Sequence, residues 1–127
     1  MSVADVHDRI GNAALLFMVI AGVWGIIRWR RQQKIDQNYF GVLVVGELLL
    51  VVQMFIGLYM WLGLQSAPAG GRPWLHYLYG FVTVLTLPAV YAYTRGRTEE
   101  VWDQALYAFV CLTVAALVYR AMTTAVF

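Results

Sequence analysis

The sequence has few charged residues. Asp, Glu, Lys and Arg together make up 13% of the 127 residues, whereas hydrophobic residues make up 61%. In an ordinary soluble domain about a quarter of the residues are charged. No basic surface interleaved with aromatic residues is present to bind nucleic acid. The composition therefore excludes a soluble or nucleic-acid-binding domain and indicates an integral membrane protein.

Cysteine is almost absent as well. Cys111 is the single cysteine of the sequence and lies in an apolar run, which excludes a disulfide framework and a cysteine-based metal site. There is no Ser/His/Asp arrangement and no carboxylate pair suited to hydrolysis, so hydrolase classes are excluded too. The N-terminus is acidic and mixed, with Asp5 and Asp8, unlike a basic signal peptide. We therefore expect the first helix to be retained.

Long apolar stretches fill the rest of the chain. They run approximately over 10–27, 40–64, 74–93 and 101–119, and each has about the length that a helix needs to cross a hydrocarbon core of ~30 Å. The residues between them form short connectors. The sequence therefore predicts a single all-α transmembrane domain over 1–127, an up-and-down four-helix bundle in which the first and third helices are diagonal.

The positive charges predict an orientation. Short cytoplasmic loops carry the excess of Lys and Arg. The loops after the first and third spans carry six of them: Arg28, Arg30, Arg31, Lys34, Arg95 and Arg97. The opposite side carries three: Arg9, Arg72 and Arg120. Both termini are therefore predicted to lie on the outer side of a cell membrane, and this arrangement suits a bacterial inner membrane.

Histidine occurs at two positions, each at the start of an apolar run and each followed four residues later by glycine. The segments are His7-Asp-Arg-Ile-Gly11 and His76-Tyr-Leu-Tyr-Gly80. Residues i and i+4 share a helix face, so each glycine removes bulk beside its histidine and leaves room for a flat ligand. Both histidines are predicted at the outer ends of parallel helices, at matching depth. This pattern predicts one haem b held between His7 and His76.

In these segments the chain resembles the four-helix b-type cytochromes of membranes, and in particular one half of a heme A synthase. The resemblance implies a four-helix unit in which histidines near the outer ends of alternate helices bind haem, often with glycine one turn further on. Two departures are clear. The second four-helix half of heme A synthase has no counterpart here, and Asp8 and Tyr77 follow the histidines where that family commonly has arginine.

Further residues can be assigned around the predicted haem. Arg9, Arg72 and Arg120 are predicted near the level of the histidines, where guanidinium groups would pair with haem propionates. Asp5 or Asp8 would accept the second ring N–H of His7. The alternative is that these are juxtamembrane charges in contact with headgroups, that His76 belongs to an interfacial aromatic belt, and that His7 lies on a solvated terminus.

The spans themselves contain a few polar or helix-distorting residues. Glu47 is expected to be neutral and hydrogen-bonded, or to serve a cytoplasmic-side site, a proton path or a partner helix. Gln53 is expected to hydrogen-bond between helices. Pro88 should bend the third helix. Glycines are expected to permit close helix approach at positions 22, 25, 41 and 46.

Two functional classes are compatible with these features. The first is a small membrane b-type cytochrome that transfers electrons within or alongside a respiratory or photosynthetic chain, with a quinone or other membrane electron-transport subunits as its partners. The second is a cofactor-free accessory or assembly subunit of a larger membrane electron-transport complex. A transporter fits less well because the polar residues are too sparse to line a substrate path.

Overall fold

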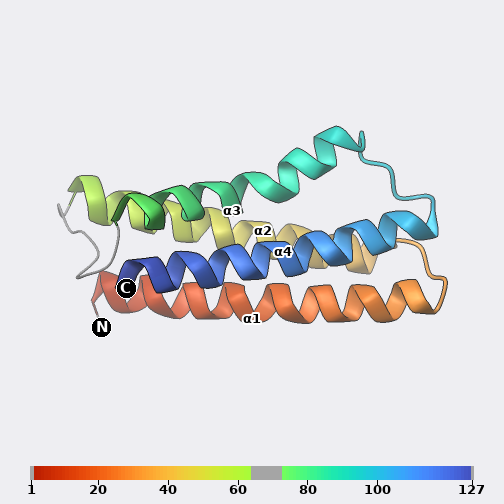
Figure 1. Ribbon diagram of the computed structural model, residues 1–127, viewed down its shortest axis with the longest axis horizontal. Coiled ribbons are helices and arrows are strands. Elements are labelled where there is room, and N and C mark those ends of the chain that lie inside the picture. Colours follow the sequence, from red (N-terminus) through yellow and green to blue (C-terminus); the bar gives the residue numbers. More distant parts are fainter. Residues whose placement is uncertain (1, 64–72, 127) are drawn as a thin grey trace.

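The computed structural model describes residues 2–63 and 73–126. Four α-helices make up most of this part of the chain: α1 (Val3–Arg30), α2 (Gln37–Leu58), α3 (Pro73–Tyr93) and α4 (Val101–Val126) (Figure 1). A π-helical turn, η1 (Tyr59–Gly63), continues α2, and no strand occurs in these ranges. All four helices are long and apolar enough to cross a membrane. The predicted all-α, multi-pass membrane protein is confirmed.

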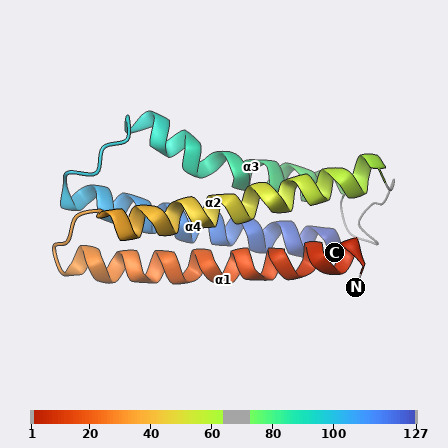
Figure 2. The same cartoon turned by 180° about the vertical axis from the view of Figure 1, so that it is seen from behind.

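The helices pack as an up-and-down bundle. Both ends of the described chain lie at one end of the bundle, which we call the terminal end (Figures 1 and 2). Helix α1 packs most extensively against α4, and α4 also packs against α3, whereas α1 and α3 are not an extensively packed pair. Helices α1 and α3 are therefore diagonal, and since both begin at the terminal end, they run in the same direction.

Helix α1 begins earlier than the apolar stretch predicts. Its first turn is closed by a capping box, in which Ser2 Oγ accepts from Asp5 N and Asp5 Oδ2 accepts from Ser2 N, both at 3.1 Å. The helix therefore starts at Val3 and not near Ile10. This extension places His7 within the helix.

Small residues let α1 approach its neighbours closely. A Cβ added at Gly25 would lie 2.8 Å from Ala108 Cβ and would also overlap Tyr39 Oη, which donates to Ala21 O at 2.8 Å. The expected close approach at Gly25 is confirmed. At Gly41 it is not, because no atom of the described chain lies within 4 Å of an added Cβ there.

Buried polar groups join the helices at the end opposite to the termini. Arg28 was predicted as a cytoplasmic loop cation, but it is 9% exposed. Its Nε donates to Gln104 Oε1 at 3.0 Å and its Nη2 donates to Lys34 O. Asp36 Oδ2 lies 3.4 Å from the same Nη2. Arg28 lies at the end opposite to the termini, as predicted, but in the last turn of α1 and not in the loop, because the helix continues to Arg30.

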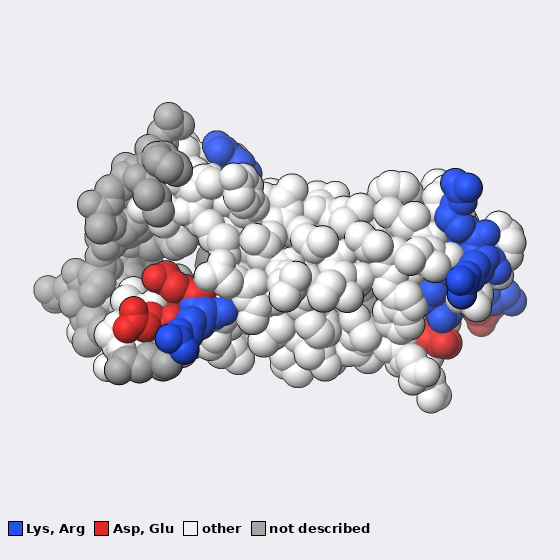
Figure 3. All heavy atoms as spheres, turned by 90° about the horizontal axis from the view of Figure 1, so that it is seen from below, with Lys and Arg blue, Asp and Glu red and all other residues white. Residues whose placement is uncertain are grey.

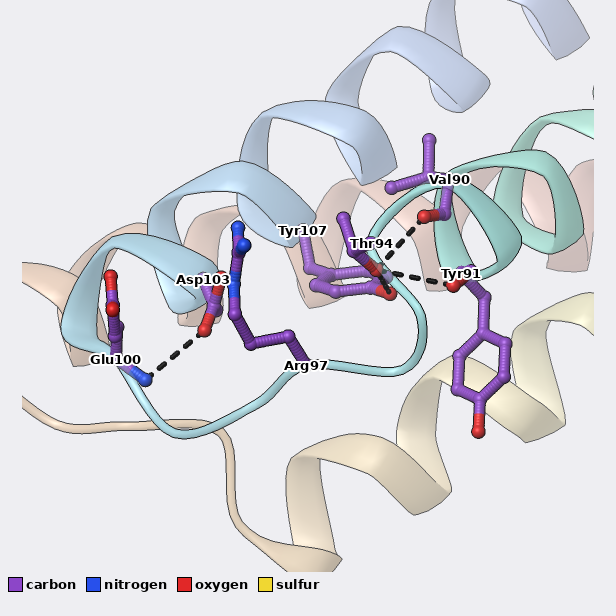
Figure 4. A network of polar contacts seen from close by, with 7 residues as sticks. All are labelled: Val90, Tyr91, Thr94, Arg97, Glu100, Asp103 and Tyr107. Carbon is purple, nitrogen blue, oxygen red and sulfur yellow. Dashed lines mark hydrogen bonds and ion pairs between the residues drawn. The ribbon is translucent and has the colours of Figure 1, made fainter.

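The connection between α3 and α4 is held by a second polar network at the same end (Figure 4). Asp103, which is fully buried, accepts from Arg97 Nε at 2.8 Å and from Glu100 N at 3.1 Å. Thr94 Oγ1 lies 3.2 Å from Tyr107 Oη. These contacts fix the start of α4 against the end of α3.

On the face drawn in Figure 3, charged side chains gather at the two ends of the bundle, with an uncharged band between them. The end opposite to the termini carries exposed Arg30, Arg31, Lys34, Arg95 and Arg97. An uncharged band between charged ends is what a membrane-spanning bundle requires, since charge in the hydrocarbon core is costly.

Candidate functional site

The two histidines come together at the terminal end of the bundle. His7 lies in the second turn of α1 and His76 in the first turn of α3. Their ring centroids are 6.3 Å apart and their planes are inclined by 75°. Two diagonal helices thus present their imidazoles to each other at the same depth.

His76 is oriented by α4. Its Nδ1 donates to the carbonyl oxygen of Ala121 at 2.7 Å. Because a carbonyl can only accept, Nδ1 carries the proton, and in the neutral ring Nε2 then has a free lone pair. Metal-binding histidines commonly use a backbone carbonyl in this way to fix the ring and its tautomer. The contact with Ala121 therefore holds the His76 ring in one orientation and leaves Nε2 unprotonated.

His7 is held by α2. A Cβ added at Gly57 would lie 3.2 Å from His7 Cε1, so the glycine makes room for the ring. The carbonyl oxygen of His7 accepts from Gln53 Nε2 at 2.7 Å. The ring nitrogen Nδ1 is buried and has no hydrogen-bond partner among the described residues. A buried ring nitrogen without a partner is available to bind a ligand.

The predicted carboxylate partner of His7 is not found. The side chain of Asp5 forms the capping box with Ser2, and Asp8 is exposed and makes no contact with Nδ1. The expectation was wrong for Asp5 because a carboxylate in the first helical turn satisfies free backbone N–H groups.

The two glycines that follow the histidines lie in different surroundings. A Cβ at Gly11 would lie 2.9 Å from Gln53 Nε2 and 3.3 Å from Met122 Cε, so these side chains take the room beside Gly11. A Cβ at Gly80 would meet no atom of the described chain within 4 Å. Open space therefore lies beside Gly80 and not beside Gly11.

Three arginines were predicted near the histidines. The two that the structure describes, Arg9 and Arg120, do not lie in the interior of the bundle. Arg9 is exposed. Arg120 is exposed as well; its Cζ lies 5.8 Å from the centre of the Tyr79 ring, and its Nη1 donates to Thr123 Oγ1 at 3.4 Å. Helix α4 continues beyond Arg120 to Val126. Arg72 lies outside the described residues.

Several residues around the histidines were not predicted as part of the site. Gln53 was predicted to hydrogen-bond between helices, and its bond to α1 confirms this, but the acceptor, the His7 carbonyl oxygen, was not predicted. Gly57 follows Gln53 by four residues, as Gly11 and Gly80 follow the two histidines. This spacing is the signal from which Gly57 could have been predicted. The contribution of Ala121 is a backbone carbonyl, for which the sequence gives no signal.

Two imidazoles are too few ligands for a metal ion that is bound by protein side chains alone. Within residues 2–63 and 73–126 no group of three or more His, Cys, Asp or Glu side chains could hold a metal ion, whereas structural zinc sites use four protein ligands. Haem iron needs fewer, because the macrocycle supplies the equatorial nitrogens and the protein supplies the axial ligands. Comparisons of the chain with protein-family models, with curated proteins and with solved structures find no match.

Proposed function

We propose that the chain is a small b-type cytochrome of the membrane, in which His7 and His76 hold one haem b near the terminal end of the bundle. The observation that carries the proposal is the pair of facing imidazoles, 6.3 Å apart between centroids. Metal–imidazole bonds are about 2.0–2.1 Å long for zinc. Two imidazole rings that bind one ion from opposite sides therefore have their centres roughly 6 Å apart. The 6.3 Å separation is close to this value, which supports His7 and His76 as the residues that would hold one haem iron.

A haem held by both His7 and His76 would transfer electrons and would not bind oxygen. Its chemistry when bound is the gain and loss of one electron, and the ligands and their hydrogen bonds set its potential. In this chain the hydrogen bond from His76 Nδ1 to Ala121 O would raise the basicity of that ligand. We therefore assign electron transfer within or alongside a respiratory or photosynthetic chain, with a quinone or other membrane electron-transport subunits as its partners.

Arginines at the terminal end would neutralise the haem propionates. Arg9 and Arg120 have exposed guanidinium groups at that end, and neither forms an ion pair with a carboxylate of the described residues. An unpaired guanidinium near the membrane surface can take a propionate through charge-assisted hydrogen bonds. Arg72 is assigned to the same role from its place in the sequence.

We further propose that the terminal end faces the outside of a bacterial inner membrane, because the opposite end carries the larger group of Lys and Arg (Figure 3). In intact cells, Ser2→Cys should react with a membrane-impermeant maleimide and Lys34→Cys should react after lysis. Cys111 is fully buried and gives the background. If Lys34→Cys and not Ser2→Cys were labelled in intact cells, the protein would have the opposite orientation.

A larger side chain at Gly80 is expected to exclude the haem. Gly80→Leu fills the open face next to His76, so haem per purified chain should fall at least about tenfold relative to the unchanged protein. Gly41→Leu is the matched control, because Gly41 is also helical and also faces open space. Haem is measured as the pyridine haemochrome. Equal haem content in the two variants would contradict a haem beside Gly80.

A further inference from the structure

A groove of about 270 Å³ lies between α2 and α3, away from the histidines. Its walls include Phe40 and Val44 of α2 and Pro88 and Tyr91 of α3. Proline within a helix lacks the N–H that would bond to the preceding turn and bends the helix. Helix α3 diverges from the bundle toward its C-terminal end (Figures 1 and 2), and α2 and α3 are the least extensively packed of the four neighbouring helix pairs.

Glu47 is the acidic residue in this apolar groove. Both of its carboxyl oxygens are buried, and neither has a hydrogen-bond partner among the described residues. The expectation that Glu47 is hydrogen-bonded within the bundle is therefore wrong for this part of the chain. A buried carboxyl without a partner is costly in an apolar setting, so a ligand that supplies a hydrogen bond would be favoured there.

The position of Glu47 restricts what this ligand can be. Glu47 lies near the middle of the candidate span Gln37–Gly63, and ten helical residues, about 15 Å of rise, separate it from Gly57 beside His7. An acyl chain offers no hydrogen bond, and a phospholipid headgroup would have to leave the interface. A ring that bears oxygen atoms and is attached to an apolar tail can reach this depth and form a hydrogen bond with the carboxyl group.

We propose that the groove binds the ring of a membrane quinol or quinone. A ring hydroxyl donates to the carboxylate of Glu47, or a protonated Glu47 donates to a ring carbonyl. Phe40 and Tyr91, whose ring centroids are 6.0 Å apart, supply aromatic surface for the ligand ring. The use of this ligand as an electron partner rests on the proposed cytochrome function, but the binding itself does not need the haem.

The test is equilibrium binding of a decyl-tailed benzoquinol to the full chain in lipid nanodiscs, with empty nanodiscs subtracted and bound quinol quantified after extraction. Saturable binding of about one quinol per chain is expected. Glu47→Leu should raise the Kd at least about tenfold. Val44→Trp should do the same by filling the groove, whereas Val45→Trp is the matched control, since Val44 and Val45 are similarly exposed at 44% and 48% and Val45 does not line the groove.

Four outcomes would overturn the proposal: no saturable excess over empty nanodiscs, an unchanged Kd for Glu47→Leu, equal binding by Val44→Trp and Val45→Trp, or equal competition by decylbenzene, which would identify the occupant as an alkyl chain. Glu47→Leu does not depend on steric filling and remains decisive if Val44→Trp fails to fold. The same titration on a His7→Ala/His76→Ala variant should give an unchanged Kd. Failure of quinol binding and failure of haem binding are therefore separate results.

Discussion

Replacing His7 or His76 with alanine is expected to abolish the α band of a b-type haem and to lower haem content from about one per chain to less than about a tenth. Each substitution removes one of the two axial ligands, and the neighbouring side chains offer no third histidine to replace it. Reduced-minus-oxidised spectra of the purified variants, with pyridine haemochrome quantification, measure the effect.

Trp74→Ala is the control for these histidine variants. Trp74 lies in the first turn of α3 with His76 but is 67% exposed, so its removal should leave the haem content unchanged. Helix content measured by circular dichroism should be equal in all variants. His76→Gly should recover the band when imidazole is added. If a double alanine variant kept its full haem content, the axial assignment would be wrong.

Arg28→Ala is expected to destabilise the protein strongly. The substitution leaves the fully buried Gln104 Oε1 without its donor and removes the link to Lys34 O and Asp36. A buried polar group without a partner costs about 1–3 kcal/mol, and three contacts are lost together. We expect the free energy of unfolding in detergent to fall by about 2–3 kcal/mol.

Arg30→Ala removes the same charge from the same helical turn and is the matched control. Arg30 is exposed, and substitutions at exposed positions usually change stability by less than about 0.5 kcal/mol. Urea or thermal unfolding of both variants, followed by circular dichroism, gives the comparison. A similar loss of stability in both would mean that helix-terminal charge matters here and that the buried contacts of Arg28 do not.

The general arrangement could be predicted from the sequence because it depends on few physical constraints. Four apolar stretches joined by short loops restrict the chain to adjacent antiparallel helices. The first and third helices then start at the same end, which is why His7 and His76 were expected at one depth. The structure brings their rings to 6.3 Å.

The details that were missed depend on atoms that hydropathy does not describe. The apolar stretch that begins near Ile10 does not show where the helix starts, which depends on the hydrogen bonds of Ser2 and Asp5 that begin α1 at Val3. The spacing of His7 and Gly11 identified a shared helix face. The side chains that occupy the space beside Gly11, Gln53 of α2 and Met122 of α4, depend on how these helices pack against α1. Helix periodicity alone does not encode these contacts between helices.

The most direct test of the cytochrome assignment is a reduced-minus-oxidised absorption spectrum of the purified, unchanged protein, with pyridine haemochrome quantification. We expect a b-type α band at about one haem per chain, from a low-spin site with two histidine ligands. A featureless spectrum from a folded preparation that had been supplied with haem would contradict it, and the chain would then be assigned as a cofactor-free accessory or assembly subunit.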